Sequence, residues 1–278
     1  MRPQEHYERG ELREAVAAAT EQVRQHPSDP APRIFLCELL SFTGDLERAD
    51  RQLDALGHQD PQQMVGVQVF RRLVRAEQAR QQFYSDGRVP EFLGVPSPVL
   101  RLHLEASIRV REGKLDEAAD LLARAEAERP RVSGTCNGQP FDDLRDLDDL
   151  TAPFLEVLTS AGQYFWVPWD RIESAEFEAP TRPLDLVWRR THLVVRDGPD
   201  GVVFVPTLYS GTHNDPDDAL RLGRSTDWRG GDGAPVRGFG QRMLLTGEAT
   251  VPILEVQSLA VDQPADADRP ADAETPAP

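Results

Sequence analysis

The sequence predicts an α+β protein, in which an N-terminal tetratricopeptide-like α-helical array precedes a mostly β C-terminal domain that forms a twisted sheet or partial barrel. Three segments with one shared pattern of glycine, leucine, alanine and proline lie before residue 131. Short runs of β-branched and aromatic residues, separated by turn residues, lie after it. These observations divide the chain into residues 1–130, residues 131–261 and an acidic, proline-rich tail at residues 262–278.

The three similar segments are residues 10–27, 44–61 and 113–130, and each opens with glycine and closes with proline. The first two opening glycines are 34 residues apart, and the second and third are 69 apart, one more than twice 34. A period of 34 is that of the tetratricopeptide repeat, a helix–turn–helix unit. Each segment also carries one apolar stripe, such as the one that contains Leu53 and Leu56, so each is predicted to be an amphipathic helix.

Partner helices are predicted before two of these segments, at residues 31–43 and 97–112. Residues 61–87 are predicted to form one long helix, because the glycine expected near position 78 is absent. The first segment has too few residues before it for a full partner helix. The array is therefore short and imperfect, and its concave face suits a helix or an extended peptide.

The second half is predicted to be mostly sheet. Its predicted strands are residues 154–159, 163–168, 173–178, 186–195, 201–209, 240–247 and 251–261. The first two form a hairpin around Gly162, and the fourth and fifth form another. The turn-rich residues 132–140 are predicted to be a linker and the glycine-rich residues 223–233 a mobile loop. The tail at 262–278 has the composition of a disordered segment.

Composition excludes several classes of function. The formal net charge is −16, which disfavours contact with phosphate backbones, so nucleic acid is not an expected partner. No run of about 18 apolar residues could span a bilayer, and the opening residues lack the apolar core of a secretory signal. The two cysteines, Cys37 and Cys136, do not form a disulfide framework. We expect a cytoplasmic protein without a membrane partner.

Two groups of residues are candidate chemical sites. Cys136, with His192 and His213 downstream, could act as a nucleophile with a histidine base, although no local signature accompanies it. The carboxylates of residues 142–149 could hold a hard cation, but the spacing of a calcium loop is absent. The alternative for that cluster is a polar segment in which Arg145 pairs with one acid. A small hydrolase that uses Cys136 or the Asp142–Asp149 cluster, with the helical array as a targeting arm, is therefore the rival hypothesis.

The four tryptophans all lie in the second half, and each is near an arginine or aspartate. They either pack in the core with satisfied indole N–H groups or form a recognition surface, where tryptophan and arginine are enriched. On the second interpretation, arginines such as Arg145, Arg171 and Arg189 fix the register of a partner through carboxylates.

Five segments, residues 38–56, 137–158, 164–172, 203–209 and 220–228, resemble the ImpE/TagJ family, also called the SciE type, of bacterial type VI secretion accessory proteins. The resemblance covers about residues 10–260. It implies a cytoplasmic, non-enzymatic adaptor without a cofactor or metal. Its partner would be a helix of the small subunit of the contractile sheath (TssB-like), and it would thereby also contact the ClpV-type AAA+ ATPase that dismantles contracted sheath.

The tryptophans and these segments together provide ten candidate partner-binding residues. They are Arg145, Asp146, Trp166, Trp169, Arg171, Trp188, Arg189, Tyr209, Arg224 and Trp228. The resemblance supplies no catalytic set and does not decide which half binds the partner. A third interpretation is a scaffold that self-associates through its repeats to form a homo-oligomer.

Overall fold

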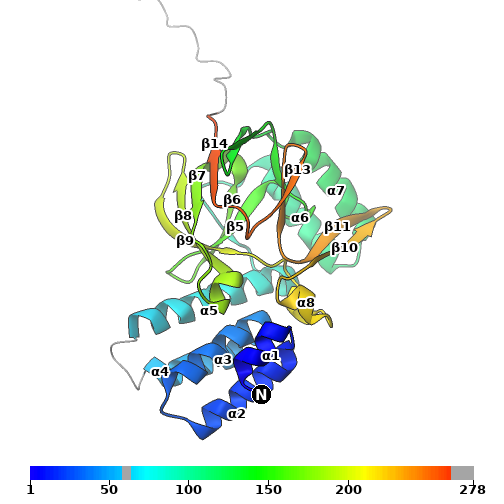
Figure 1. The fold of residues 1–278 in the computed structure, drawn as a ribbon. Coiled ribbons are helices and arrows are strands. Elements are labelled where there is room, and N and C mark those ends of the chain that lie inside the picture. Colours follow the sequence, from blue (N-terminus) through cyan, green and yellow to red (C-terminus); the bar gives the residue numbers. More distant parts are fainter. Residues whose placement is uncertain (58–63, 264–278) are drawn as a thin grey trace, which may run out of the picture.

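The computed structural model describes residues 1–57 and 64–263. Seven helices lie within the described part of residues 1–130, where the sequence predicts a helical array, and the longest of them runs beneath the β half (Figure 1). These helices are α1 (Pro3–Arg9), α2 (Leu12–Gln25), α3 (Pro30–Phe42), α4 (Leu46–Gly57), α5 (Met64–Asp86), α6 (Pro98–Arg111) and α7 (Leu115–Glu128). No helix in the described part of the chain is both long enough and apolar enough to cross a bilayer.

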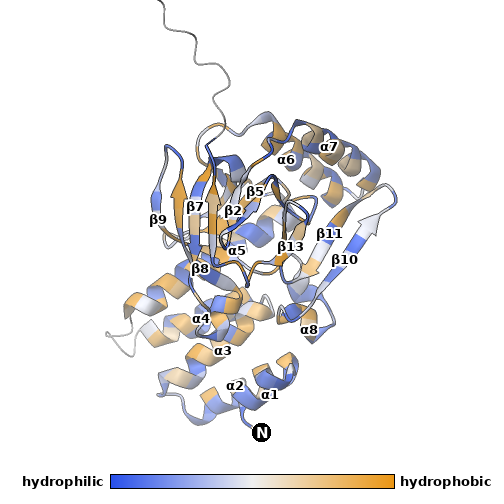
Figure 2. Cartoon of the chain, turned by 45° about the horizontal axis from the view of Figure 1, so that its top comes forward, coloured by the Kyte–Doolittle hydropathy of each residue, from blue (hydrophilic) through white to orange (hydrophobic). Residues whose placement is uncertain are grey.

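The repeated pattern produces amphipathic helices, as predicted. The apolar stripe of α4 is fully buried, with Leu53 inaccessible and Leu56 3% exposed. Helix α6 begins after Ser97, whose hydroxyl accepts a hydrogen bond from the Leu100 amide at 3.3 Å. Along the helices, hydrophobic and hydrophilic residues alternate in short stretches (Figure 2). Packing of these stripes, rather than helix propensity alone, therefore holds the array together.

The opening glycines of the repeats are required by backbone conformation and by packing. Gly10, Gly44 and Gly113 all have positive φ, between 68° and 82°, which L side chains rarely adopt. A Cβ atom on Gly44 would also lie 2.5 Å from a carbon of the His213 ring. The glycine of the second repeat thus lets the helical half approach the β half closely.

The β half contains a nine-stranded sheet with the order β1-β6-β5-β9-β8-β7-β14-β2-β3, a three-stranded sheet and a separate two-stranded ribbon. Strands of the large sheet are β1 (Glu91–Phe92), β2 (Gly134–Cys136), β3 (Gln139–Phe141), β5 (Phe154–Leu158), β6 (Tyr164–Pro168), β7 (Ile172–Phe177), β8 (Trp188–Val195), β9 (Asp200–Pro206) and β14 (Ser258–Val261). The three-stranded sheet has the order β13 (Ala249–Pro252), β12 (Met243–Thr246) and β4 (Leu144–Asp146), and the ribbon is β10 (Thr226–Gly231) with β11 (Ala234–Gly240). Short helical segments in this half are η1 (Trp169–Arg171), η2 (Pro183–Leu186), η3 (Thr212–Asn214) and α8 (Asp218–Arg221).

Both predicted hairpins are present, as β5–β6 and β8–β9. Three other predictions were wrong. Residues 132–140 are not a linker, because they contain the β2–β3 hairpin, and residues 223–233 contribute β10 to the ribbon instead of forming a mobile loop. The run 251–261 is not one strand, because a turn at 253–257 separates β13 from β14. Main-chain pairing with strands far along the chain determines the structure of these three segments. Local composition does not reveal such pairing.

The two halves share one hydrophobic core. A single cluster of buried side chains includes residues of α2–α6 together with Phe154, Trp166 and Trp188 of the sheet. The Phe83 ring of α5 lies edge-on to Trp166 with ring centroids 4.9 Å apart, and Phe70 lies edge-on to Trp188 at 6.1 Å. Helix α5 is therefore the element through which the helical half packs on the sheet.

Replacement of Leu53 by alanine tests the predicted repeat core. Loss of a fully buried leucine is expected to lower the free energy of unfolding by about 3 kcal/mol, measured by urea denaturation. Arg51→Ala is the matched control, because the Arg51 side chain on the same helix is 67% exposed. Equal stabilities for the two variants would contradict the burial of the α4 stripe.

Candidate functional site at the junction of the two halves

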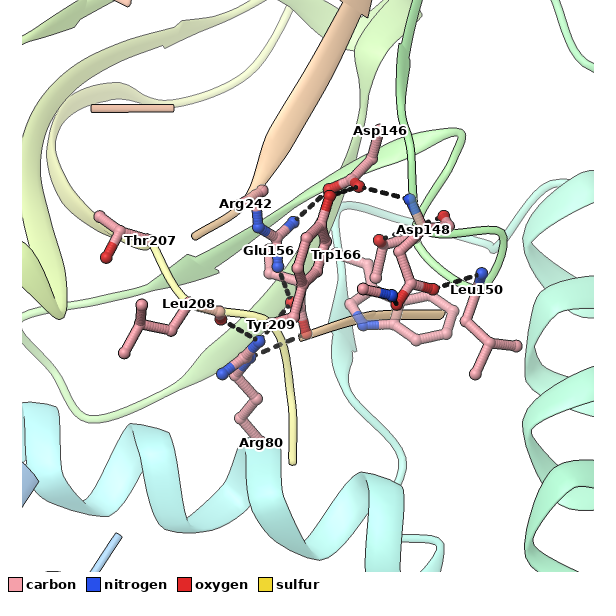
Figure 3. Close-up of polar contacts among 12 residues, drawn as sticks. Arg80, Asp146, Asp148, Leu150, Glu156, Trp166, Thr207, Leu208, Tyr209 and Arg242 are labelled. Carbon is pink, nitrogen blue, oxygen red and sulfur yellow. Dashed lines mark hydrogen bonds and ion pairs between the residues drawn. The ribbon is translucent and has the colours of Figure 1, made fainter. Parts of the chain in front are cut away.

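Glu156 on β5 is the centre of a buried network of charges between the two halves (Figure 3). Its Oε1 accepts hydrogen bonds from Arg80 Nε at 3.0 Å, from the Tyr84 hydroxyl at 3.0 Å and from the Tyr164 hydroxyl at 2.5 Å. Its Oε2 accepts from Arg80 Nη2 at 2.9 Å and from Arg242 Nη2. The Glu156 side chain is inaccessible to solvent, so both arginines neutralise it without help from water.

A second layer extends the network away from α5. Arg242 Nη1 donates to Asp146 Oδ2 at 2.9 Å, and the Tyr209 hydroxyl donates to Asp146 Oδ1 at 2.8 Å. Next to them, Asp148 accepts two hydrogen bonds from Arg237 Nε, at 3.0 and 2.9 Å. The network therefore joins β4, β11 and the segment before β12 to the centre of the large sheet.

Helix α5 enters the network through two residues one turn apart. Arg80 Nη2 also donates to the Leu208 carbonyl at 3.0 Å, and Arg80 Nη1 donates to Glu77 Oε1 at 3.1 Å. Glu77 in turn accepts a hydrogen bond from the Trp188 indole at 3.1 Å. One face of α5 thus binds β5, β8 and the chain after β9 at once.

Burial and charge act in opposite directions on these carboxyl groups. Burial alone would raise the pKa of Glu156, but the Arg80 and Arg242 charges outweigh it and hold the pKa well below the usual value. At Asp146 burial prevails over Arg242 and raises the pKa to about 6. Glu156 therefore keeps its charge in the folded protein. The role of the network is structural, because it connects the helical half to the β half.

An open groove lies beside this junction, between α5 and β9. Its volume is about 330 Å³, and we call it the α5–β9 groove. It is lined by Gly66, Val69, Phe70, Leu73, Glu178, Ala179, Thr181, Arg182, Asp185, Arg190 and Phe204. The apolar side chains come from α5 and β9, while the charged ones form paired rims, Arg190 with Glu178 and Arg182 with Asp185.

Two exposed valines extend the apolar surface of the groove. Val65 is 77% exposed and precedes Val69 by one helical turn, and Val202 is 40% exposed and lies two residues before Phe204 on β9. Spacings of four on a helix and two on a strand place each pair on one face. The apolar lining therefore continues outward from the groove on both walls.

Six of the ten candidate residues lie in the core. They are Asp146, Trp166, Trp169, Trp188, Arg189 and Tyr209, each at most 2% exposed. The indole N–H groups of Trp166, Trp169 and Trp188 all have partners. These three tryptophans thus follow the core-packing alternative, and their side chains contact the interior of the folded protein.

The other four candidates keep contact with solvent. Trp228 on the β10–β11 ribbon is 38% exposed and lies against Tyr209. Arg224 is exposed and donates to the main-chain carbonyls of Tyr7 at 2.7 Å and Glu8 at 3.1 Å, so it closes the end of α1. Arg145 and Arg171 are partly exposed.

Arg145 pairs within the chain with Asp149 at 3.0 Å, as the polar-segment alternative for residues 142–149 predicts. Arg171 donates instead to the Arg196 carbonyl at 3.1 Å. Arg189 donates to the carbonyls of Ile253 and Val256, both at 2.7 Å. Both arginines donate hydrogen bonds to main-chain oxygens in loops of the β half. The sequence contains no pattern that predicts these contacts.

The described residues do not assemble either candidate chemical site. Cys136 is buried in β2, and burial raises the pKa of its thiol, which opposes thiolate formation. His192 on β8 pairs with Asp200 at 2.8 Å, and His213 packs on Gly44. Four of the five acids of residues 142–149, namely Asp143, Asp146, Asp148 and Asp149, pair with arginines, and no group of three metal-ligating side chains occurs within residues 1–57 and 64–263.

Sequence reasoning missed the residues at the centre of the junction. Arg80, Glu77, Glu156 and Arg242 were not among the candidates. The available signal was a charge inside an apolar strand pattern, "FLEVL", in which every residue from Phe154 to Leu158 is buried. A charged residue at such a position requires a buried partner.

Replacement of Glu156 by glutamine removes the buried carboxylate that Arg80 and Arg242 share, so that, among the described residues, Arg80 keeps only Glu77 and Arg242 keeps only Asp146 as an ion-pair partner. We expect the free energy of unfolding to fall by about 3–5 kcal/mol, as for other broken buried ion pairs. Glu176→Gln on the exposed side of β7 is the control. Urea denaturation measures both, and a loss below about 1 kcal/mol at Glu156 would mean that the network contributes little to stability.

Replacement of Trp169 by alanine distinguishes core packing from recognition. Because Trp169 is 1% exposed, the variant is expected to lose about 3–5 kcal/mol of stability. Trp228→Ala, on the exposed ribbon, is expected to change it by less than about 1 kcal/mol. If the Trp169 variant had the wild-type melting temperature, core packing would be contradicted and Trp169 would remain a candidate partner-binding residue.

Glu38 on α3 predicts a specific pH dependence. It is 4% exposed, beside Arg182 at 3.6 Å, and burial raises its pKa from 4.5 to about 7. The folded protein therefore binds this proton more tightly than the unfolded chain does, so the contribution to stability is complete below pH 4.5 and is lost as the pH rises through 7.

Glu38→Gln should accordingly reduce the fall in unfolding free energy between these pH values. Urea denaturation at a series of pH values provides the comparison, with the 84% exposed Glu47→Gln as control. Parallel curves for the wild type and Glu38→Gln would refute a raised pKa at this position.

Comparisons with known proteins agree with this architecture. The sequence profile of the ImpE protein family matches residues 138–260, and a tetratricopeptide repeat profile matches residues 6–66. The chain is 34% identical over 258 residues to the type VI secretion system accessory component TagJ of Pseudomonas aeruginosa, which covers 93% of this chain and 90% of that protein. A crystal structure of a Vibrio parahaemolyticus protein superimposes with a TM-score of 0.88 at 29% identity, covering 94% of this chain and 97% of that one. The chain therefore belongs to the ImpE/TagJ family of type VI secretion accessory proteins.

Proposed function

We propose that this protein is a non-enzymatic adaptor that binds a helix of the small subunit of the type VI sheath. Through that contact it modulates sheath assembly and disassembly together with the ClpV-type ATPase. The observation that supports this proposal is the similarity to TagJ, an accessory component of type VI secretion, along 93% of the chain. Because the similarity includes both halves, the whole chain is expected to serve one role.

The α5–β9 groove is the docking site that we propose for the sheath helix. Its floor is apolar, with Phe70 and Leu73 from α5 and Phe204 from β9. A helix presents apolar side chains at intervals of three and four residues, which a groove of about 330 Å³ accepts a few at a time. Val65 and Val202 at the two margins would be covered by the bound helix.

The rims of the groove suit a helix that carries both signs of charge. Arg190 pairs with Glu178 on one side and Arg182 with Asp185 on the other. Side chains of the partner would replace or extend these surface pairs, which contribute more to register and orientation than to affinity. The apolar contact then supplies most of the binding free energy, so the affinity should depend only weakly on salt.

A double variant, Val65→Glu with Val202→Glu, tests the groove. Both side chains are exposed, so the variant should fold with an unchanged melting temperature and bind the purified sheath small subunit at least about tenfold more weakly, because charge at both margins opposes an apolar helix. Titration calorimetry with the sheath subunit measures the affinity.

Val95→Glu is the matched control, because Val95 is 88% exposed and lies outside the lining of the groove. Wild-type affinity for the groove variant would place the docking site elsewhere on the protein. Absence of any binding by the wild-type chain would contradict the adaptor function itself.

A further inference from the structure

The β10–β11 ribbon has one covered edge and one open edge. It is a separate two-stranded sheet that projects from the side of the β half (Figure 1). On the β11 edge, the carboxylates of Asp148 and Asp149 accept hydrogen bonds from main-chain amides of β11 at 3.0 and 2.7 Å. On the β10 edge, residues 227–230 are all exposed, and among the described strands only β11 pairs with β10.

The open edge presents the main chain of Trp228. The Gln241 amide donates to the Ser225 carbonyl at 3.1 Å, and a bond in this place flanks a non-hydrogen-bonded pair of an antiparallel ladder. Such pairs alternate with hydrogen-bonded ones, so the pair Trp228–Gly238, two positions further along, is also non-hydrogen-bonded. The N–H and C=O groups of Trp228 therefore point away from β11, toward the open edge.

An edge of this kind is a template for another strand. Proline and lysine block many natural edges, but β10 contains neither residue. Its central side chain, Trp228, is 38% exposed and lies against the Tyr209 ring with the centroids 5.7 Å apart. The edge thus offers both unpaired main-chain groups and an aromatic side chain to an added strand.

The charges of β10 complement a second copy of the same strand in one register. Asp227 and Arg229 flank Trp228, and their side chains are 55% and 47% exposed. When two β10 strands lie antiparallel about Trp228, Asp227 of each copy lies opposite Arg229 of the other. The two adjacent registers, centred on Asp227 or on Arg229, place like charges opposite each other. Opposite charges across a strand pair stabilise it and like charges destabilise it, so the register about Trp228 is favoured.

The same register satisfies the main chain. The outward groups of Trp228 in the two copies then face each other, so each Trp228 amide can donate to the Trp228 carbonyl of the other copy. The two indole rings lie on one face of the pair, where aromatic cross-strand neighbours add stability. The two ribbons would form one four-stranded sheet in the order β11-β10-β10-β11.

The contacts within one chain leave the two charges available. Arg229 pairs with Asp215 and stacks on Phe239, with its guanidinium carbon 4.0 Å from the ring centroid, so its side chain is held along the ribbon. Asp227 lies 3.4 Å from Arg229 Nε in an exposed pair. Exposed pairs contribute little to stability, so their replacement by pairs between two copies costs little.

We propose that two copies of this chain associate through β10, antiparallel and in register about Trp228. The dimer is weak, because a bulge after Arg229 ends the regular edge and the contact is smaller than a standard interface of about 1,600 Å². Repulsion between two chains of net charge −16 weakens it further. The strand shares no residue with the α5–β9 groove, so the proposal does not rest on sheath binding.

Sedimentation velocity of the full-length chain tests the dimer, at chain concentrations from about 10 to about 500 μM in about 0.15 M salt. We expect a concentration-dependent shift from monomer to dimer. Asp227→Arg and Arg229→Asp should each raise the dissociation constant at least about tenfold, because each brings like charges together. An equal mixture of the two variants should regain the wild-type constant within about threefold, because every arginine again lies opposite an aspartate.

Asp120→Arg is the matched control, since Asp120 is an exposed acid on α7 outside the ribbon. It should dimerise like the wild type. A wild-type chain that stays monomeric over the whole range would overturn the proposal. A mixture that associates no more strongly than the separate variants would overturn it too.

Hydrogen exchange of the wild-type chain, read by NMR at the same concentrations, locates the interface without any substitution. The Trp228 amide should exchange at least about threefold more slowly at the highest concentration than at the lowest. The Arg229 amide is the internal control, because the Arg229–Arg237 pair is hydrogen-bonded within the ribbon and should be protected at every concentration. Dimerisation without a change at Trp228 would place the contact elsewhere, such as on the repeats, and would contradict the proposal.

Discussion

The ion pair between Glu156 and Arg80 is the interaction on which the rest of the structure depends. It joins the centre of the sheet to the longest described helix, inside a core where Glu156 is inaccessible and Arg80 is 4% exposed. Such a pair needs every donor and acceptor satisfied, since the desolvation cost otherwise exceeds the Coulomb attraction. Tyr84, Tyr164 and Arg242 complete the hydrogen bonds of Glu156. The pair is therefore specific to one placement of α5 on the sheet, which apolar packing alone would define less sharply.

That placement also shapes the surface. The face of α5 that carries Glu77 and Arg80 is held on the sheet, so the N-terminal part of the same helix forms a wall with Val69 and Phe70 opposite β9. A sheath helix bound there would contact both halves at once. Neither half alone forms both walls of the groove, so the proposed docking requires the two halves to be one body.

Local patterns in the sequence were enough to predict the helical array. The 34-residue spacing, the buried stripe of α4 and the interruption near position 78 all follow from periodicity and from glycine. The β2–β3 hairpin and the β10–β11 ribbon did not follow, because their strands are short and glycine-rich and depend on partners far along the chain. For the candidate tryptophans, composition leaves both core packing and a recognition surface open, and the structure shows that Trp169, Trp188 and the candidate Arg189 are buried. Composition does not distinguish a tryptophan that recognises a partner from one that fills a core, and the charges that join the halves belong to elements 76 residues apart.

The central claim is that the Glu156 network makes the helical and β halves one cooperative body. Equilibrium urea unfolding of the wild-type chain, followed both by far-UV circular dichroism at the helical signal and by tryptophan fluorescence, tests it most directly, because all four tryptophans lie in the β half. We expect the circular dichroism and fluorescence transitions to coincide, with one midpoint. A fluorescence transition separated from the loss of helix would show that the halves unfold independently, and would contradict the role given to Glu156.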